Sequence, residues 1–225
     1  MFTLSAVPVK FIGLLIFFAF TTAYETYQLV KATSARGRIS HGLHWLMSVI
    51  MLLMVPKNIW VPFRTVVPVP VSIFLMVLGV IWFGYLAVMA RPGHRAHPTG
   101  CTLMFAAMAW HLAAMMVKMQ NMKAMGGMSG GSHGGMSGGS HGGMGGGMNH
   151  QLMWGGHSAL WWMALIGIPL MAYLLYASIR AVALALKEPS RRIEALSDFA
   201  MNFGMFWMST GLMTPILPFF KYLAF

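Results

Sequence analysis

The stretch "CTLMFAAMAWHLAAMMVKMQNM", residues 101–122, contains a single charged side chain, that of Lys118. A helix needs about 20 mostly apolar residues to cross the hydrocarbon core of a bilayer. The stretch is therefore predicted to be a transmembrane helix. Because it also holds a histidine among several methionines, it bears on function as well as on fold.

The rest of the chain is similarly apolar. Of the 225 residues, 58% are hydrophobic and 8% are charged, and the mean hydropathy is +0.68. About a quarter of the residues are charged in a typical soluble domain. Six blocks qualify as spans, at roughly 6–30, 41–56, 69–90, 98–119, 158–184 and 194–220. The predicted fold is all-α, a polytopic membrane protein with about six transmembrane helices in a bundle.

This prediction divides the chain into three parts. Residues 1–119 form transmembrane helices 1–4, residues 120–157 form a disordered loop, and residues 158–225 form helices 5–6. The second block is expected to continue along the membrane interface through "KNIWVPF", residues 57–63. Pro215 and Pro218 are expected to kink or end the last helix.

The distribution of Lys and Arg predicts the orientation in the membrane. One set of connections holds Lys31, Arg36, Arg38, Arg91, Arg95, Arg180, Lys187, Arg191 and Arg192. The other set holds only Lys10, Lys57, Arg64, Lys118, Lys123 and Lys221. Cytoplasmic loops carry the excess of basic residues. We therefore expect a plasma-membrane protein whose termini and long loop are extracytoplasmic.

The net charge of +11 arises because the chain has only four acidic residues, Glu25, Glu188, Glu194 and Asp198. The basic residues lie between hydrophobic blocks, which is typical of contact with anionic membrane lipids. No continuous basic face is apparent, so a nucleic acid is not an expected partner. Cys101 is the single cysteine, which excludes an internal disulfide.

The long loop contains a tandem repeat. "GGMSGGSH" occupies residues 126–133 and 134–141, and "GGMGGGMNH" at 142–150 is a degenerate third copy. The Gly and Ser predict a flexible coil. They do not account for the regularly placed thioethers and imidazoles, which belong to Met125, Met128, His133, Met136, His141, Met144, Met148 and His150.

These side chains are suited to copper. Thioether sulfur is a soft ligand that favours Cu(I), and imidazole binds copper in either oxidation state. The segment has no carboxylate, which argues against Ca²⁺, Mg²⁺ and Mn²⁺. Cu(I) is therefore the expected metal. Nickel, zinc, or a linker with incidental Met and His are the alternatives.

Similar side chains form stripes inside the predicted spans. The stripe in the fourth span lies within about 80° of arc and consists of Met104, Met108, His111, Met115, Met119 and Met122. A wider stripe in the second span consists of His41, His44, Met47, Met51 and Met54. The last span has Asp198, Met201, Met205 and Met208 on one side.

Each stripe has two interpretations. Methionine often fills gaps between packed helices, and we prefer this interpretation for the last span. For the fourth span, a ligand role is equally supported, because polar residues at membrane depth often mark a functional path. His111 is also able to serve as a hydrogen-bond partner for a neighbouring helix. The metal-site hypothesis includes His44, Met47 and Met51 of the second span.

Other polar residues are assigned structural roles. Glu25 and Asp198 are expected to pair with nearby bases such as Arg36 or Arg38, with a proton relay as the alternative. His94 and His97 are expected to be surface residues. No Walker A loop, Ser-His-Asp pattern, paired carboxylates or Cys-x-x-Cys is found, so the chain is not expected to be an enzyme.

Two resemblances add to this interpretation. "HGLHWLMSVIMLLM" followed by "LMFAAMAWHLAAMM" resembles an actinobacterial family of multi-spanning membrane proteins of unknown function with His/Met-rich stretches. The Met-x-x-x-Met spacing of Met104 and Met108 is also similar to that of high-affinity copper transporters. Those transporters have three spans rather than six, and here the Met-rich segment is internal, so the resemblance does not extend to the architecture.

Taken together, the patterns predict a membrane protein that captures or delivers copper at the outer face. Its expected client is a haem–copper oxidase or another cuproenzyme. The alternative is a non-catalytic accessory subunit of a larger membrane complex, such as a respiratory supercomplex, that acts by helix packing. A copper permease is the third hypothesis.

Overall fold

The computed structural model describes residues 8–91, 93, 95–126 and 159–213. In these residues the chain is helical and has no strand, which confirms the predicted all-α class there. The elements in chain order are α1 (Pro8–Lys31), α2 (Ala35–Met54), α3 (Lys57–Val66), α4 (Val69–Met89), α5 (Ala96–Gly126), α7 (Ala159–Lys187), the 3₁₀ turn η2 (Pro189–Arg191) and α8 (Arg192–Met213).

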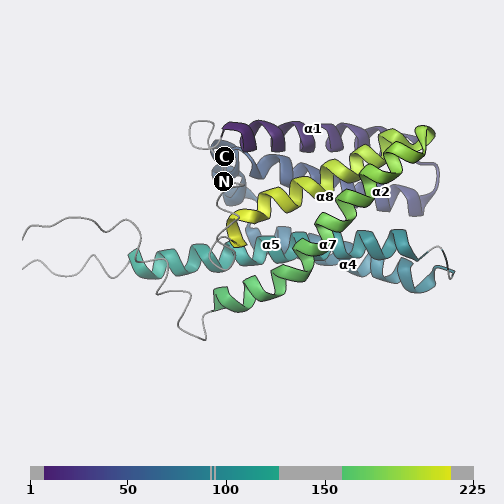
Figure 1. Cartoon of the computed structure of the whole chain (residues 1–225). Helices are drawn as coiled ribbons and strands as arrows, with labels where there is room; N and C mark the ends of the chain where they lie inside the picture. The colour runs from purple at the N-terminus through teal and green to yellow at the C-terminus, as the bar shows by residue number, and fades with distance from the viewer. Residues whose placement is uncertain (1–7, 92, 94, 127–158, 214–225) are drawn as a thin grey trace, which may run out of the picture.

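The long helices α1, α2, α4, α5, α7 and α8 lie side by side in one bundle, with α7 crossing its neighbours obliquely (Figure 1). The main packed pairs are α1 with α2 and α8, α4 with α5, and α7 with α5 and α8. The connections α1–α2, α4–α5 and α7–α8 lie at one end, which we call the basic end. The connections at the basic end carry Lys31, Arg36, Arg38, Arg91, Arg95, Lys187, Arg191 and Arg192.

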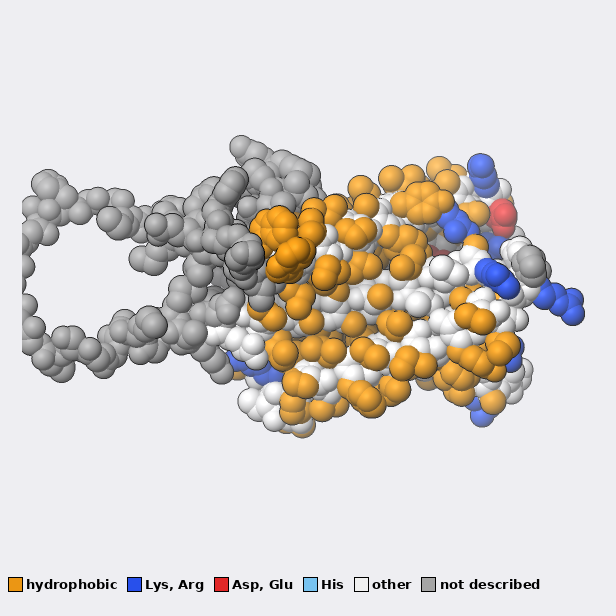
Figure 2. Space-filling view, turned by 90° about the horizontal axis from the view of Figure 1, so that it is seen from below, with side chains coloured by type: hydrophobic (Ala, Val, Ile, Leu, Met, Phe, Trp, Pro, Cys, Tyr) orange, Lys and Arg blue, Asp and Glu red, His pale blue; other side chains and the backbone are white. Residues whose placement is uncertain are grey.

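Four of the described helices are long and apolar enough to cross a membrane. These spans are Pro8–Lys31, Val69–Met89, Ala96–Gln120 and Trp161–Lys187. Hydrophobic side chains cover the body of the bundle, and Lys and Arg gather mainly at its basic end (Figure 2). The structure is therefore consistent with a multi-pass membrane protein in contact with lipid.

The helices α2 and α8 are more polar, and several of their polar side chains contact neighbouring helices. In α2, the Trp45 indole donates to Thr26 Oγ1 at 3.0 Å, and Ser48 Oγ lies 3.2 Å from Thr22 Oγ1 of α1. In α8, the buried polar side chains are Ser197, Asn202, Ser209 and Thr210. Of these, Ser209 and Thr210 bond to His111 of α5 and Lys10 of α1, whereas Asn202 donates to the Asp198 carbonyl oxygen of its own helix.

The second predicted block differs from the structure at both ends. The helix begins at Ala35 rather than near residue 41, because the Ser34 hydroxyl accepts the Gly37 N–H at 3.1 Å and caps it. It ends at Met54, before Pro56. The following residues form the separate short helix α3, whose Trp60 is buried, so the expected interfacial continuation is an independent element. At the other end of the chain, Pro215 and Pro218 lie outside the described residues.

The core is rich in methionine and aromatic residues. Fully buried side chains include Phe18, Met47, Met51, Met76, Phe105, Met108 and Met205. Gly79 of α4 lies against the Phe105 ring, and a Cβ at this position would collide with that ring. The absence of a side chain at Gly79 therefore allows α4 and α5 to approach closely, as small residues do in membrane helix pairs.

Candidate functional site

The stripe on α5 faces the interior of the bundle. Met104, Met108 and His111 are 5%, 0% and 6% exposed, and Met115 and Met119 are half-buried. The methionines belong to one contiguous core cluster, which also contains Met47, Met51, Met201, Met205 and Met208. Residues four apart on a helix have neighbouring side chains. The stripe is therefore a line of soft donor atoms shielded from lipid.

His111 joins α5 to α8. Its Nδ1 lies 2.8 Å from Ser209 Oγ, and its Nε2 has no hydrogen bond with a described residue. The next hydroxyl of α8, that of Thr210, accepts a hydrogen bond from the buried Lys10 ammonium of α1 at 2.8 Å. Lys10 also acts electrostatically on His111. His111 therefore has one ring nitrogen available for a ligand, but a nearby ammonium group opposes a cation there.

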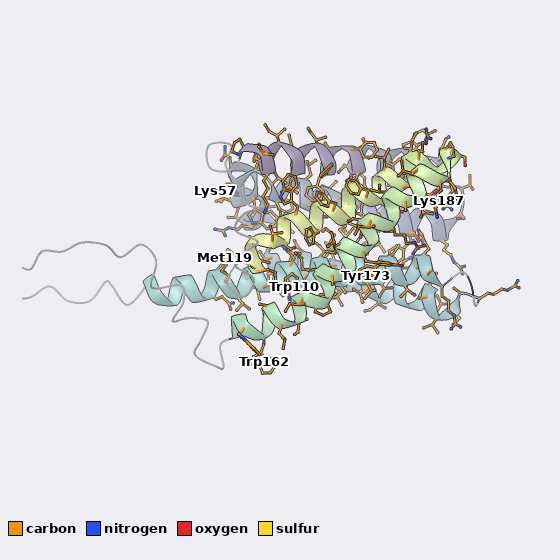
Figure 3. The ribbon with its side chains drawn as sticks, viewed as in Figure 1. Lys57, Trp110, Met119, Trp162, Tyr173 and Lys187 are labelled. Atoms are coloured by element: carbon orange, nitrogen blue, oxygen red, sulfur yellow. The ribbon has the colours of Figure 1, made fainter. Side chains whose placement is uncertain are left out.

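Met119 differs from the other members of the stripe. Its sulfur accepts a hydrogen bond from Arg64 Nη1 of α3 at 3.0 Å. Figure 3 shows Met119 on the same side of the bundle as Lys57, with Lys187 at the opposite end. The guanidinium group competes with a metal ion for the lone pairs of this sulfur. Met119 is therefore a weaker candidate ligand than its position in the stripe indicates.

Met104 and Met108 have the surroundings best suited to a soft ion. They lie one turn apart near the middle of the candidate span, and they have no polar partner among the described residues. His111 follows Met108 by three residues, so its ring lies on the same helix face. Two thioethers and one imidazole nitrogen are thus available from a single buried stripe, which is a soft donor set typical of Cu(I).

The stripe predicted in the second span is divided between two neighbours. His44 Nδ1 lies 3.0 Å from the Ser40 carbonyl oxygen, and its ring contacts those of Phe83 and Phe105 at 4.9 and 5.4 Å. Met47 and Met51 are fully buried in the core. His41 instead faces α1. The predicted stripe is therefore not a single ligand face.

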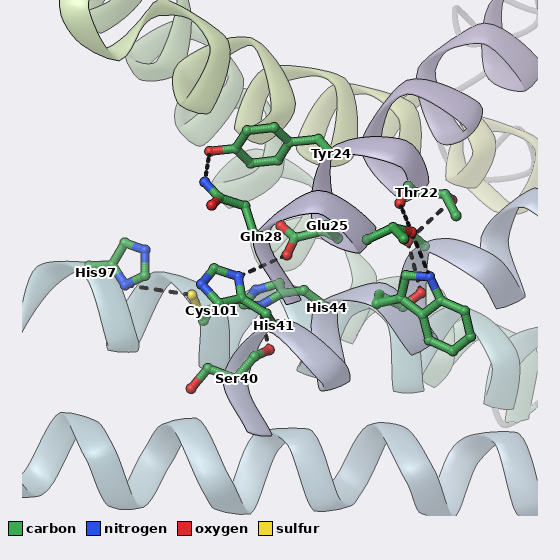
Figure 4. A network of polar contacts seen from close by, with 12 residues as sticks. Thr22, Tyr24, Glu25, Gln28, Ser40, His41, His44, His97 and Cys101 are labelled. Carbon is green, nitrogen blue, oxygen red and sulfur yellow. Dashed lines mark hydrogen bonds and ion pairs between the residues drawn. The ribbon is translucent and has the colours of Figure 1, made fainter. Parts of the chain in front are cut away.

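His41 is the partner of Glu25, with 3.0 Å between Nδ1 and Oε2 (Figure 4). The expected partners Arg36 and Arg38 do not form this ion pair; Arg38 Nε donates to the Ala32 carbonyl oxygen at 2.9 Å instead. The Asp198 carboxyl forms no hydrogen bond or ion pair with a described residue, although it acts electrostatically on Glu25. The predicted pairing of both acids with arginine is thus replaced by one His–Glu pair.

The sequence interpretation missed a continuation of the α5 stripe. His97 Nδ1 lies 3.9 Å from the sulfur of the buried Cys101 (Figure 4). The spacing from His97 to Cys101 to Met104 is four and three residues, the same helical spacing that defines the stripe. His97 is exposed as expected. Extending the periodicity toward the start of α5 is the signal that finds this pair.

Several predicted ligands have side chains that the structure does not describe. Met122 and Met125 belong to α5, which continues past the predicted boundary at residue 119, but their side chains are not described. Outside the described residues lie Met128, His133, Met136, His141, Met144, Met148 and His150. Within the described part of the chain, no group of three or more His, Cys, Asp or Glu side chains is arranged to hold a metal ion. A metal site there depends on thioethers.

Comparison with known proteins identifies no relative. No family model, curated protein or solved structure matches the chain. The resemblance to an actinobacterial family therefore remains a prediction. The roles of the α5 residues rest on their chemistry and burial.

Proposed function

We propose that the protein binds Cu(I) within the membrane and captures or delivers it at the outer face. The observation that carries the proposal is the juxtaposition of Met104, Met108 and His111 on one buried face of α5. The thioethers remain neutral at any pH, so a soft ion does not have to displace protons from them. The Met/His segment that follows α5 would supply ions to this stripe.

The proposed topology has six spans, with α2 and α8 crossing beside the four apolar helices. Both helices run alongside the others in the bundle, which supports this arrangement (Figure 1). The concentration of Lys and Arg supports a cytoplasmic location for the basic end. The end of α5 that leads into residues 127–150 then faces the outside.

Charge favours capture over transport across the membrane. A Cu(I) ion held by thioethers and imidazole keeps its positive charge, and burying an unpaired charge is costly. The four acidic residues, which would offset that charge, all belong to the basic-end parts of the bundle. The cost of moving that charge through the rest of the membrane supports a protein that holds copper and releases it to a client rather than a permease.

The test is competition for Cu(I) between the purified protein and a chromophoric chelator. The full chain is compared with a serine variant, in which the Met and His residues of 125–150 are replaced by Ser. We expect the full chain to bind several ions and the serine variant to keep the ion bound by α5. Weaker binding of that ion by the serine variant carrying Met108→Leu identifies the stripe. Met76→Leu, a fully buried methionine on α4, is the matched control.

Association with a cuproenzyme or a respiratory complex stays a prediction and has its own test. Purification from native membranes in mild detergent, followed by identification of co-purifying subunits and their copper content, detects the client. Copper uptake by proteoliposomes tests the permease hypothesis. Uptake that depends on Met108 would contradict capture at the outer face, whereas binding without uptake supports it.

A further inference from the structure

The α7–α8 pair has a groove on its exposed surface, and this groove shares no residue with the copper stripe. It has a volume of about 220 Å³ and is lined by Leu175, Ser178, Ile179, Val182, Phe199 and Phe203. Leu175, Ile179 and Val182 are 39%, 63% and 41% exposed, so the groove opens to the surroundings of the bundle. We propose that this groove holds the acyl chain of an anionic phospholipid whose phosphate binds Arg192.

The lining of the groove is suited to a hydrocarbon chain. Phe199 and Phe203 are stacked, with ring centroids 5.2 Å apart and planes 12° apart, and each packs edge-on against Phe17 of α1. The Ser178 hydroxyl already donates a hydrogen bond to the Leu174 carbonyl oxygen at 2.7 Å. The groove therefore offers a rigid apolar wall without a free donor, which favours a chain without polar groups.

The charge at the end of the groove favours an anionic headgroup. Arg192 lies on the same face of α8 as Phe199, seven residues earlier, and its Nε donates to the Ala185 carbonyl oxygen of α7 at 3.3 Å. Arg191 is paired with Glu188 and Glu194 at 3.8 and 3.0 Å. Arg192 and Lys187 have no acidic partner among the described residues. Their charges are therefore available to a phosphate.

The distances agree with the dimensions of a lipid. Seven helical residues separate Phe199 from Arg192 by about 10 Å along α8. The polar layer of a bilayer is about 5–8 Å deep on each side. A chain lying against Phe199 and Phe203 therefore places its phosphate within reach of the flexible Arg192 side chain. Because the groove and the cation are held by the same two helices, the site needs no other protein.

The test is native mass spectrometry of the purified full chain, titrated with phosphatidylglycerol or with phosphatidylcholine of the same chain length. Arg192→Gln removes the charge, and Val182→Trp fills the groove. Arg95→Gln is the matched control, because Arg95 also lies at the basic end and donates its Nε to a helix-terminal carbonyl, that of Ala90, at 2.9 Å. Soluble glycerophosphate is added as a competitor to separate a lipid site from a phosphate site.

We expect phosphatidylglycerol to bind at least fivefold more tightly than phosphatidylcholine. Arg192→Gln should weaken phosphatidylglycerol by about fivefold, the effect of one basic residue at an anionic surface. Val182→Trp should weaken both lipids, and Arg95→Gln should change neither. Equal binding of the two lipids, an equal loss in Arg95→Gln, or displacement by glycerophosphate would overturn the proposal. So would a Val182→Trp variant that retains lipid but loses a co-purifying protein, because a partner helix would then occupy the groove.

Discussion

The sulfur atoms of Met108 and Met119 have different surroundings, although they share one face of α5. Met108 is fully buried without a polar partner among the described residues, whereas the sulfur of Met119 accepts a hydrogen bond from Arg64. We expect Met108→Leu to weaken the copper site of the serine variant by about tenfold, equivalent to about 1.4 kcal/mol. Met119→Leu should weaken it less than twofold. The Cu(I) affinity of both variants is measured by competition with a chelator.

Leucine is a suitable replacement because Met-to-Leu exchanges in cores usually cost less than about 1.5 kcal/mol of stability. Thermal unfolding of the copper-free proteins serves as the control and should give similar midpoints for both variants. If Met119→Leu weakens copper binding as much as Met108→Leu, the contact with Arg64 does not withhold that sulfur from the metal. The ligand set would then have to include the outer end of α5.

The His41–Glu25 pair gives a prediction about stability. Glu25 is buried, with a side chain 10% exposed, and His41 is its hydrogen-bonding partner. Removing the partner of a buried carboxylate costs about 1–3 kcal/mol. His41→Ala should therefore lower the free energy of unfolding by that amount. The double variant His41→Ala/Glu25→Gln should recover part of the loss, because the amide is easier to bury than a carboxylate.

A double-mutant cycle in detergent, followed by denaturant unfolding, isolates the coupling between these two side chains. His97→Ala is the control, because His97 lies at the same end of the bundle but contacts Cys101. Strictly additive effects of the two substitutions would show that the pair does not contribute to stability. This result would favour the proton-relay alternative for Glu25, because His41 would then not fix the position of the carboxyl.

At the scale of the helix, close approach of α4 and α5 depends on Gly79. A Cβ there collides with the Phe105 ring, whereas a Cβ at Gly84, also on α4, meets only Thr102 Cγ2 at 4.0 Å. Overpacking typically costs about 1–3 kcal/mol. We expect Gly79→Ala to destabilise the protein by that amount and Gly84→Ala to be neutral or stabilising, because alanine favours helix. Thermal unfolding of the two variants tests this, and equal midpoints would show that α4 and α5 separate without cost.

The helices themselves were predictable because hydrophobic length is a strong signal. Each of the six predicted blocks overlaps one long helix of the structure. The start of α2 was missed because its first turns are basic, and only the Ser34 cap marks them. The segment that forms the separate helix α3 was expected only as a continuation of the second block, and the break at Pro56 was not used to divide the two.

For the candidate site, the buried face of α5 was predictable from the sequence, but its partners on other helices were not. The burial of the α5 stripe follows from its periodicity, which the structure confirms for Met104, Met108 and His111. The partners of these residues come from other helices, so spacing within one helix carries no information on them. How the helices pack determines three contacts: that of His111 with Ser209, that of Met119 with Arg64, and that of Glu25 with His41.

The arginine side chains at the basic end show a shared role that only the assembled bundle reveals. Arg38, Arg95 and Arg192 each donate Nε to a carbonyl oxygen at or near the end of the preceding helix, those of Ala32, Ala90 and Ala185. Cations stabilise the carbonyl ends of helices. These three arginines thus cap α1, α4 and α7, and in the proposed topology the same residues would also bias the orientation of the protein in the membrane.

For the whole molecule, the charge distribution predicts which end faces the cytoplasm. Asn58 in α3 and Ser190 in η2 lie at opposite ends of the bundle, and both are exposed. In a Cys101→Ser background, Asn58→Cys should react with a membrane-impermeant maleimide on intact cells, and Ser190→Cys should react only after the membrane is permeabilised. Labelling is measured by the mass shift of the purified protein.

The pattern of labelling separates the alternatives because the two positions are joined by an odd number of proposed spans. Reaction of both cysteines from outside would contradict the six-span arrangement, since an even number of crossings would then separate α3 from η2. Reaction of Ser190→Cys alone would reverse the orientation, so that the Met/His segment would face the cytoplasm. Copper capture at the outer face requires the first pattern, because only then does α5 lead out of the membrane into residues 127–150.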